Sequence, residues 1–442
     1  MARASERPAY TTSDRWAFAV ERLIIFTSLL FVLSGVGTLQ VGDSANSRLA
    51  TVYSLVHDGT WYIDRPLSES PNPYEINTID KCSLHGRILS TKPPLLPLAM
   101  TVEYAALHTL FGWTLESGRD LKILLQVMIV SLIILPYLVG LVFFALLLDL
   151  LIANPWQRLL PLATMAFGTQ LPGFATELNN HTPAIAYLIV VLYFTIGLCT
   201  GKLAPTAPRF FGTGLAGALV FALDMPLTVF VAASGLALAW KYPKQAICWG
   251  GLGLAGPLLL HFGTMLYVTG SPLPVQMRKD LYLYENSAWR NPGGLDALHE
   301  PKGTYFFHMT FGRFGIFLLY PILLFGPAGL LWSLIRGEKA WRMYYAVGFG
   351  CIALLFAYYV FRTNNYGGGA YGFRWGMGVM PVLLLMGIPL FERVRSLPAW
   401  LLVFALLLVS CYSAWECYEM PWGACHEWTC RWLFGAPYAM PS

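Results

Sequence analysis

The sequence predicts an all-α polytopic membrane protein, and three observations support this prediction. The chain of 442 residues is 56% hydrophobic and only 12% charged, whereas about a quarter of the residues of a soluble domain are charged. Several stretches reach the roughly 17 to 25 apolar residues that a helix needs to cross a bilayer. The chain lacks the alternating ten-residue pattern of a membrane barrel. The composition therefore favours a bundle of about eleven transmembrane helices over a soluble enzyme.

The spans follow from the apolar runs and from the polar turns that interrupt them. The first run follows a polar start with four arginines, and it is too long for a signal-peptide core, so we expect a permanent span. The turns TELNNH at 176–181 and LDMP at 223–226 divide two longer runs. The predicted spans are 23–41, 121–150, 159–176, 182–200, 210–224, 227–240, 246–269, 313–335, 344–361, 376–391 and 398–415.

The distribution of basic residues predicts the orientation. Four short loops, around Lys202, Lys241, Arg336 and Arg393, each contain at least two basic residues. The positive-inside rule assigns such loops to the cytoplasm. We therefore expect the N-terminus inside and the C-terminus outside, with the polar turns on the outer side.

Long outer segments suggest where function lies. Residues 1–415 are predicted to form one transmembrane domain that includes outer loops at 42–120 and 270–312, and 416–442 form an outer tail that contains cysteines. The basic residues form no nucleic-acid footprint. The chain also lacks a P-loop, a metal-binding HExxH and a serine-nucleophile motif.

Five cysteines lie in or near outer segments: Cys82, Cys411, Cys417, Cys425 and Cys430. An oxidising exterior would favour disulfides among the three tail cysteines, with Cys82 as a further partner, but spacing leaves the connectivity open. The stretch CHEWTC lacks the spacing of a zinc site, so no metal is assigned to it.

Asp43 follows the first span directly and opens the first outer loop. Leu49, Val52 and Val56 repeat at helical spacing, which predicts a short amphipathic helix in the membrane interface that ends near Asp58. Asp43 is then an N-cap residue. A carboxylate held at the membrane boundary is also suited to be a general base, and the two roles are compatible.

The stretch LHGRILSTKPPLLPLAM at 84–100 places a lysine before two prolines. Pro93 and Pro94 fit the first turn of a helix, so Lys92 lies at a helix N-terminus, where free N–H groups attract anions such as phosphate. The alternative is that Lys92 reaches toward lipid headgroups as an interfacial anchor. His85 and Arg87 in the same stretch are further candidates for lining a substrate site.

Arg374 lies in the last outer turn, within YGGGAYGFRW. The glycines of this turn allow close backbone approach, and an arginine at membrane depth needs a partner. A phosphate is one such partner. The alternative is an ion pair with an acidic residue such as Asp224 or Glu177.

Asn180 and His181 lie in the turn TELNNH. Both are candidates for substrate hydrogen bonds, and the alternative is an ordinary polar turn. Asp224 and Glu177 are further candidates for lining the substrate site, because their turns share the outer face. The pattern Asn180-His181-Thr182 matches a glycosylation acceptor, but it adjoins a span. In GGLGLAG at 250–256, the glycines predict close helix packing.

These motifs together resemble the GT-C membrane glycosyltransferases. They are Asp43 after the first span, HDGTWYID, STKPPLLPL, LNNHTPA and YGGGAYGFRW. The chain is similar to the protein mannosyltransferases and the lipid A aminoarabinose transferase. The resemblance covers most of the chain in topology, but the matching motifs cover only a small part of it.

The resemblance implies an inverting transfer of a sugar from a polyprenyl-phosphate donor to a lipid, glycan or protein hydroxyl, outside a bacterial cytoplasmic membrane. It assigns the catalytic carboxylate to Asp43 and a donor-phosphate contact to Lys92. Two departures are visible: Ser44 stands where many relatives have a second acidic residue, and Thr91 where relatives often have Glu. A divalent metal therefore stays open, as does the oligomeric state.

Two other functional classes remain possible from the sequence. A transporter or lipid-linked-sugar flippase would require helix breaks and charges near the membrane midplane. A non-catalytic envelope-assembly protein would explain the missing second acidic residue.

Overall fold

A computed structural model describes residues 11–36, 41–66, 70–116, 118–336, 339–423 and 425–437. The end of the first predicted span, at 37–40, and the end of the tail, at 438–442, lie outside these ranges. The described residues are mostly helical and form one two-stranded sheet. The predicted all-α fold is confirmed.

Six helical stretches of the described residues are long and apolar enough to cross a membrane, and each overlaps a predicted span. The chain is therefore an integral membrane protein. The first helix begins at Thr12, well before its predicted start at residue 23. The stretches are α1 (Thr12–Gly35), α4 (Gly118–Ile129) continued by η3 (Val130–Ile134) and α5 (Leu135–Leu151), α8 (His181–Cys199), α11 (Pro243–Gln245) continued by η5 (Ala246–Gly250) and α12 (Gly251–Thr269), α16 (Lys339–Arg362) and α19 (Leu397–Glu419).

The other five predicted spans are shorter or broken helices. Both predicted interruptions are present, because α7 ends at Ala175 before α8 begins at His181, and Asp224 separates α9 from η4. The segments are α6 (Pro155–Phe167) with α7 (Leu171–Ala175), α9 (Ala207–Leu223), η4 (Met225–Leu227) with α10 (Thr228–Lys241), α14 (Ile316–Leu319) with η9 (Pro321–Leu324) and α15 (Phe325–Arg336), and η10 (Arg374–Val379) with α17 (Met380–Met386) and α18 (Ile388–Phe391).

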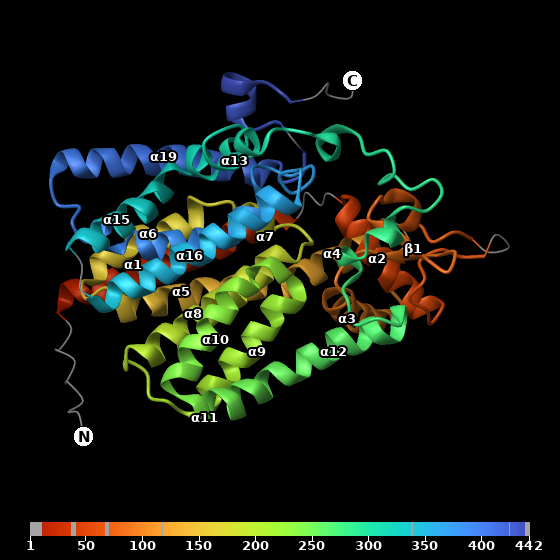
Figure 1. Cartoon of the computed structure of the whole chain (residues 1–442), viewed down its shortest axis with the longest axis horizontal. Coiled ribbons are helices and arrows are strands. Elements are labelled where there is room, and N and C mark those ends of the chain that lie inside the picture. The colour runs from red at the N-terminus through yellow and green to blue at the C-terminus, as the bar shows by residue number, and fades with distance from the viewer. Residues whose placement is uncertain are drawn as a thin grey trace.

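The first predicted outer loop lies at one end of the bundle, on the right in Figure 1, whereas the second runs from there to the upper middle and the tail lies above the bundle. The first loop folds into α2 (Asp43–His57), η2 (Glu75–Asn77), the antiparallel hairpin of β1 (Lys81–Leu84) and β2 (Arg87–Ser90), and α3 (Leu95–Phe111). The second contains η6 (Val275–Met277), η7 (Lys279–Tyr282), η8 (Gly294–Ala297) and α13 (Lys302–Thr310), and the tail contains η11 (Cys430–Phe434).

Helix α2 has the predicted extent but not the predicted environment. It ends at His57, and Gly59 follows with a φ of +65°. Every residue from Ala45 to Ser54 is buried, because α3, η2 and β2 pack around the helix. The prediction of an amphipathic helix with a free face is therefore wrong: α2 is enclosed by protein and positions polar side chains, and its place in the membrane interface stays a prediction.

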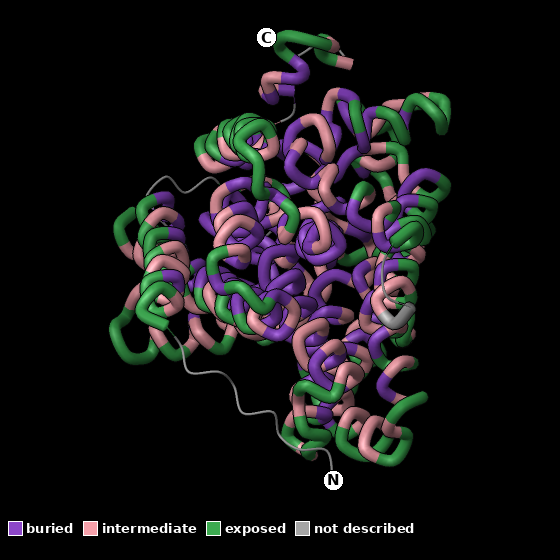
Figure 2. The backbone as a smooth tube through the Cα atoms, turned by 90° about the vertical axis from the view of Figure 1, so that its left-hand side faces the viewer, coloured by how far each residue is buried: buried purple, intermediate pink, exposed green. Residues whose placement is uncertain are grey.

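The core lies along the bundle axis, where Figure 2 shows buried backbone surrounded by a rim of exposed residues. In a membrane protein such a rim faces lipid, since helices need not hide apolar side chains there. Close helix packing at GGLGLAG is confirmed, because a Cβ on Gly253 would collide with the carbonyl oxygen of Phe211 in α9.

Candidate functional site

Asp43 lies at the edge of the outer end and is exposed. It is the first residue of α2, and the N-cap is Gly42. Its Oδ1 accepts a hydrogen bond from the N–H of Ile79 at 2.9 Å, and its carbonyl accepts one from the hydroxyl of Thr78 at 2.8 Å. The predicted N-cap role is therefore wrong, because the side chain turns away from its own helix and is held by the segment before β1.

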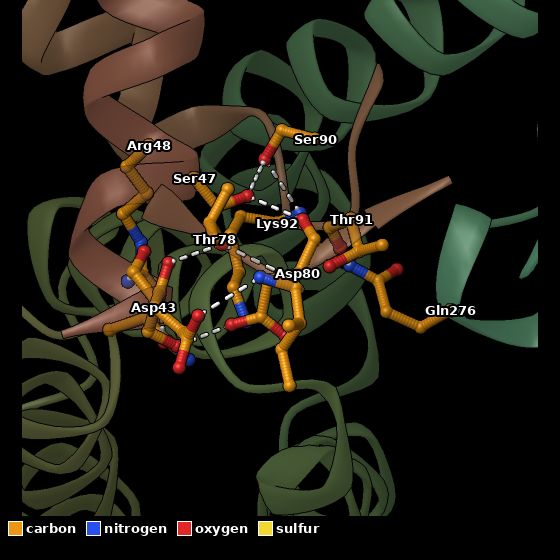
Figure 3. A network of polar contacts seen from close by, with 12 residues as sticks. Asp43, Ser47, Arg48, Thr78, Asp80, Ser90, Thr91, Lys92 and Gln276 are labelled. Atoms are coloured by element: carbon orange, nitrogen blue, oxygen red, sulfur yellow. Dashed lines mark hydrogen bonds and ion pairs between the residues drawn. The ribbon is translucent and has the colours of Figure 1, made fainter. Parts of the chain in front are cut away.

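Lys92 forms an ion pair with Asp80, with 2.6 Å between Nζ and Oδ2. Ser44 donates to the same Oδ2 at 3.2 Å, and Ser47 donates to the Asp80 carbonyl at 2.6 Å. Figure 3 shows these contacts between α2, the segment at 78–80 and the residues before α3. The lysine side chain is only 16% exposed, so it does not reach out as an interfacial anchor. The predicted helix start is confirmed, since α3 begins at Leu95 after Pro94.

The charges around Asp80 keep it ionised. Burial alone would raise the pKa of this carboxyl, but Lys92, Arg48 and Arg374 outweigh burial, so the pKa of Asp80 lies below its usual range. Burial lowers the pKa of Lys92, and Asp80 partly offsets that effect. Three cations from three segments thus surround one carboxylate.

Arg48 ties the first loop to two distant helices. It is 1% exposed, donates to the Ser44 carbonyl at 2.8 Å and donates also to the side chain of Asn180. Asn180 in turn donates to the Leu223 carbonyl at 2.7 Å. Burial lowers the pKa of Arg48 to about 10, against the opposing effect of Asp80. The guanidinium therefore remains charged at neutral pH.

His181 and Asp224 form a second buried pair. The ring Nδ1 lies 2.7 Å from Asp224 Oδ2, and the two residues are 9% and 8% exposed. They come from the start of α8 and from the break between α9 and η4. The two predicted polar turns therefore meet in space.

Arg374 lies over the ring of Trp422, 5.0 Å from the ring centroid. It forms no ion pair within 4 Å and no side-chain hydrogen bond in the described part of the chain, and its buried Nε lacks a partner there. The expected alternative of a direct pair with Asp224 or Glu177 is wrong. Glu177 instead accepts a hydrogen bond from the indole N–H of Trp422 at 2.9 Å.

The glycine-rich turn that bears Arg374 is shaped by its backbone. Gly367 has a φ of +111°, and a Cβ there would lie 2.9 Å from the Cβ of Arg374. Gly372, with a φ of +60°, donates to Glu427 in the tail at 2.6 Å. The tail therefore holds the turn in place through Glu427 and Trp422.

We call these residues the polar centre: Asp43, Arg48, Asp80, Lys92, Asn180, His181, Asp224 and Arg374. Six of them are predicted site residues, and Glu177 lies next to them behind Trp422. Sequence reasoning missed Asp80 and Arg48. Arg48 could have been found, because it is a charged residue beside Leu49 and Val52 on the apolar face of its helix. No comparable pattern in the sequence indicates Asp80.

His85 and Arg87 lie away from the polar centre. His85 occupies the exposed hairpin turn with a φ of +53°. Arg87 pairs with Asp64 at 2.8 Å and lies over Tyr62, 4.7 Å from its centroid. The contacts of the described residues connect neither to the centre, so both candidates have structural explanations.

The cysteines are all free thiols. Cys82 packs with Leu84, Leu89 and Met265 in an apolar cluster separate from the one that contains Cys417, Cys425 and Cys430. The predicted pairing of Cys82 with the tail is therefore wrong. Nowhere in the described ranges do three His, Cys, Asp or Glu side chains form a group that could hold a metal ion.

A small cavity of about 20 Å³ lies beside Lys92. Ser90 and Lys92 supply polar groups, and Trp61, Pro97 and Met265 supply apolar walls. A cavity of this size has room for about one water molecule and is too small for a sugar or a lipid headgroup.

Comparisons with known proteins give only distant likenesses. No family model and no curated protein matches the chain. The Archaeoglobus fulgidus oligosaccharyltransferase in complex with Zn and sulfate matches with a TM-score of 0.49 and 13% identity, over 92% of this chain and 54% of that chain. The same enzyme tethered by a disulfide bond to an acceptor peptide with the NVT sequon matches with a TM-score of 0.45 and 12% identity, over 90% and 55%.

The chain spans about half the length of the structures it matches. Both TM-scores lie below 0.5 and both identities below 25%. The function is therefore argued below from the residues of this chain.

Proposed function

We propose that the protein is a GT-C glycosyltransferase. It would transfer a sugar from a polyprenyl-phosphate donor to a lipid, glycan or protein hydroxyl, at the outer face of a bacterial cytoplasmic membrane and with inversion. The N-terminus would be cytoplasmic and the C-terminus outside. The proposal rests on the polar centre and on the motifs described above.

The observation that carries the proposal is the state of Arg374. A guanidinium is always charged in a protein and is costly to bury without a partner. Arg374 has neither an ion pair nor a side-chain hydrogen bond to the described residues, and two further cations, Lys92 and Arg48, border the same centre. An anionic ligand would satisfy these donors, and a phosphate at the end of a membrane bundle fits a lipid-linked donor.

The mechanism assigns one step to each group. Asp43 takes the proton from the acceptor hydroxyl as its oxygen forms a bond to the anomeric carbon. The bond between that carbon and the phosphate oxygen breaks, and polyprenyl phosphate leaves with the electron pair. Arg374 and Lys92 stabilise the negative charge that develops on this oxygen.

Asp80 changes the expected role of Lys92. Because the ammonium is already paired with a carboxylate, it would share its donors between Asp80 and the phosphate. Asp80 then positions Lys92 and keeps its charge in place between turnovers.

The residues present do not fit a divalent metal beside Lys92. Asp80 has its Oδ2 occupied by Lys92 and Ser44, and Thr91 supplies no carboxylate. No step of the mechanism therefore runs through a metal.

A transfer assay tests the proposal. The purified protein is reconstituted in vesicles with radiolabelled polyprenyl-phosphate sugars and with lipid, glycan and peptide acceptors. We expect label to move to an acceptor, and unlabelled polyprenyl phosphate to compete with the donor. If the labelled donor crosses the bilayer without transfer to an acceptor, the protein is a flippase. If neither transfer nor crossing occurs, the result supports a non-catalytic envelope-assembly protein.

A further inference from the structure

His181 and Asp224 form a hydrogen-bonded pair that the mechanism above does not use. The ring Nδ1 lies 2.7 Å from Asp224 Oδ2. Asp224 is an acceptor when ionised, so Nδ1 carries the proton in this hydrogen bond. Such a carboxylate fixes both the tautomer and the orientation of an imidazole.

The other ring nitrogen is available to a ligand. Nε2 makes no hydrogen bond to the described residues. It is also not fully buried, so a ligand can reach it. Two guanidinium groups, those of Arg48 and Arg374, border the ring in the polar centre. Burial of the ring is the main effect that disfavours a second proton, and the two guanidinium groups add to it, so that together they outweigh the opposing effect of Asp224. Nε2 therefore presents a lone pair.

The position of the pair indicates which part of a donor it meets. The ring of His181 interacts electrostatically with Arg374 and Arg48, whereas the carboxylate of Asp43 is held by the N–H of Ile79. In an inverting transfer the acceptor approaches opposite the leaving phosphate. A group beside the phosphate-binding arginine therefore faces the sugar rather than the attacking hydroxyl.

We propose that His181 and Asp224 form a sugar-recognition subsite, in which Nε2 accepts a hydrogen bond from a hydroxyl of the transferred sugar. This inference rests on the proposed function. Asp224 acts as a positioning residue, because it keeps the proton on Nδ1. A donor that lacks the matching hydroxyl leaves the lone pair without a partner and binds less well.

The first test reads the tautomer directly in the full-length protein. Nitrogen-15 NMR of histidine-labelled protein in lipid discs, with His181 assigned by its loss in His181→Asn, should show a protonated Nδ1 and an unprotonated Nε2. In Asp224→Asn the proton should shift toward Nε2, because the new amide can donate to Nδ1. A protonated Nε2 in the native protein would overturn the inference.

The second test separates sugar from phosphate by comparing the binding of polyprenyl phosphate with that of a polyprenyl-phosphate hexose. His181→Asn and Asp224→Asn should weaken binding of the sugar-bearing lipid by roughly tenfold and leave binding of polyprenyl phosphate unchanged. His181→Gln should restore much of the loss, because its amide oxygen reaches the position of Nε2. His85→Asn, on the exposed hairpin turn, is the matched control.

The outcomes distinguish the two proposals. Equal weakening of both lipids would place His181 in the phosphate site and overturn the subsite while the proposed function stands. Unchanged binding of both lipids in the variants would also overturn it. If the native protein binds neither lipid, the donor assignment and the subsite that rests on it both fail.

Discussion

Two arginines, at opposite ends of the bundle, differ in how their donors are used: Arg158 is buried, and Arg374 is half-buried with a buried Nε. Arg158, at the start of α6, is 5% exposed and pairs with Asp149. Its Nε donates to the Ile152 carbonyl at 2.8 Å, and a third nitrogen donates to Ala153 at 3.3 Å. Among the described residues, the guanidinium of Arg374 contacts the ring of Trp422 but forms no ion pair within 4 Å and no side-chain hydrogen bond. One guanidinium is satisfied by the protein, and the other is open to a ligand.

The difference teaches how to separate a structural charge from a functional one. Burial alone does not do so, because both side chains are largely removed from water. The distinguishing feature is whether the N–H donors have partners in the protein. A buried donor without a partner costs free energy unless a ligand binds it. Around Arg158 the chain supplies every acceptor, whereas in the polar centre it leaves donors unused.

The largest expected effect belongs to Asp43 in the polar centre. Asp43→Asn should lower the transfer rate by about 10²- to 10⁴-fold, because the proton acceptor is lost. Asparagine can still accept the N–H of Ile79, so the fold should remain. Initial transfer rates measure the change, and Asp280→Asn, at a side chain that is 68% exposed, is the matched control. Full turnover by the Asp43 variant would remove this residue from the mechanism.

The two arginines should respond oppositely to replacement by glutamine. Arg158→Gln should lower the free energy of unfolding by about 1.5 to 3 kcal/mol, because it removes charge-assisted hydrogen bonds from the guanidinium to Asp149 and to two backbone carbonyls. Arg374→Gln should leave stability near that of the native protein and impair donor use. Chemical unfolding in detergent and donor-concentration series check the pair. A strongly destabilised Arg374 variant with normal donor use would reverse our assignment.

A smaller effect concerns the tail that holds the turn of Arg374. Burial raises the pKa of Glu427 to about 7. Because the folded state favours the neutral acid, its stabilising contribution is present below about pH 4.5 and is lost as the pH rises toward 7. The native protein should lose on the order of 1 to 3 kcal/mol over this range.

Thermal unfolding between pH 4.5 and 8 measures this dependence. Glu427→Gln should flatten it, because glutamine stays neutral and can still accept the N–H of Gly372. Glu419→Gln, at an exposed site on α19, should keep the native profile. An unchanged slope in the Glu427 variant would show that other groups titrate.

The smallest effect should come from the hairpin outside the polar centre. Arg87→Gln removes a pair with Asp64 in which the arginine side chain is 44% exposed, and such pairs contribute about 0 to 1 kcal/mol. Transfer rates and unfolding should both stay close to native. A large loss of transfer would extend the site toward the hairpin.

Much of the fold could be predicted because its signals are local. Long apolar runs predicted the six long helices, and the breaks at 176–181 and 223–226 followed from polar and proline-containing turns. Pro93 and Pro94 predicted the start of α3. The environment of α2 could not be predicted, because its polar residues Ser47 and Ser54 looked solvent-facing until η2, the hairpin and α3 enclosed them.

The site could be predicted only in part. Asp43, Lys92 and Arg374 stood out because charged residues are conspicuous beside apolar runs. Their partners did not. Asp80, the partner of Lys92, lies in a loop without a recognisable motif. Trp422, the partner of Arg374, is 48 positions away in the sequence, so no local pattern connects the two.

The sequence by itself determined that this protein is a helical membrane protein with polar segments between its spans, because apolar length and turn residues act over a few turns of chain. Only the tertiary structure decided that Lys92 is paired with Asp80, that His181 meets Asp224, and that Arg374 has no anionic partner within 4 Å among the described residues. Those facts depend on which side chains converge from distant segments. Pairing between such segments is a property of the packed chain.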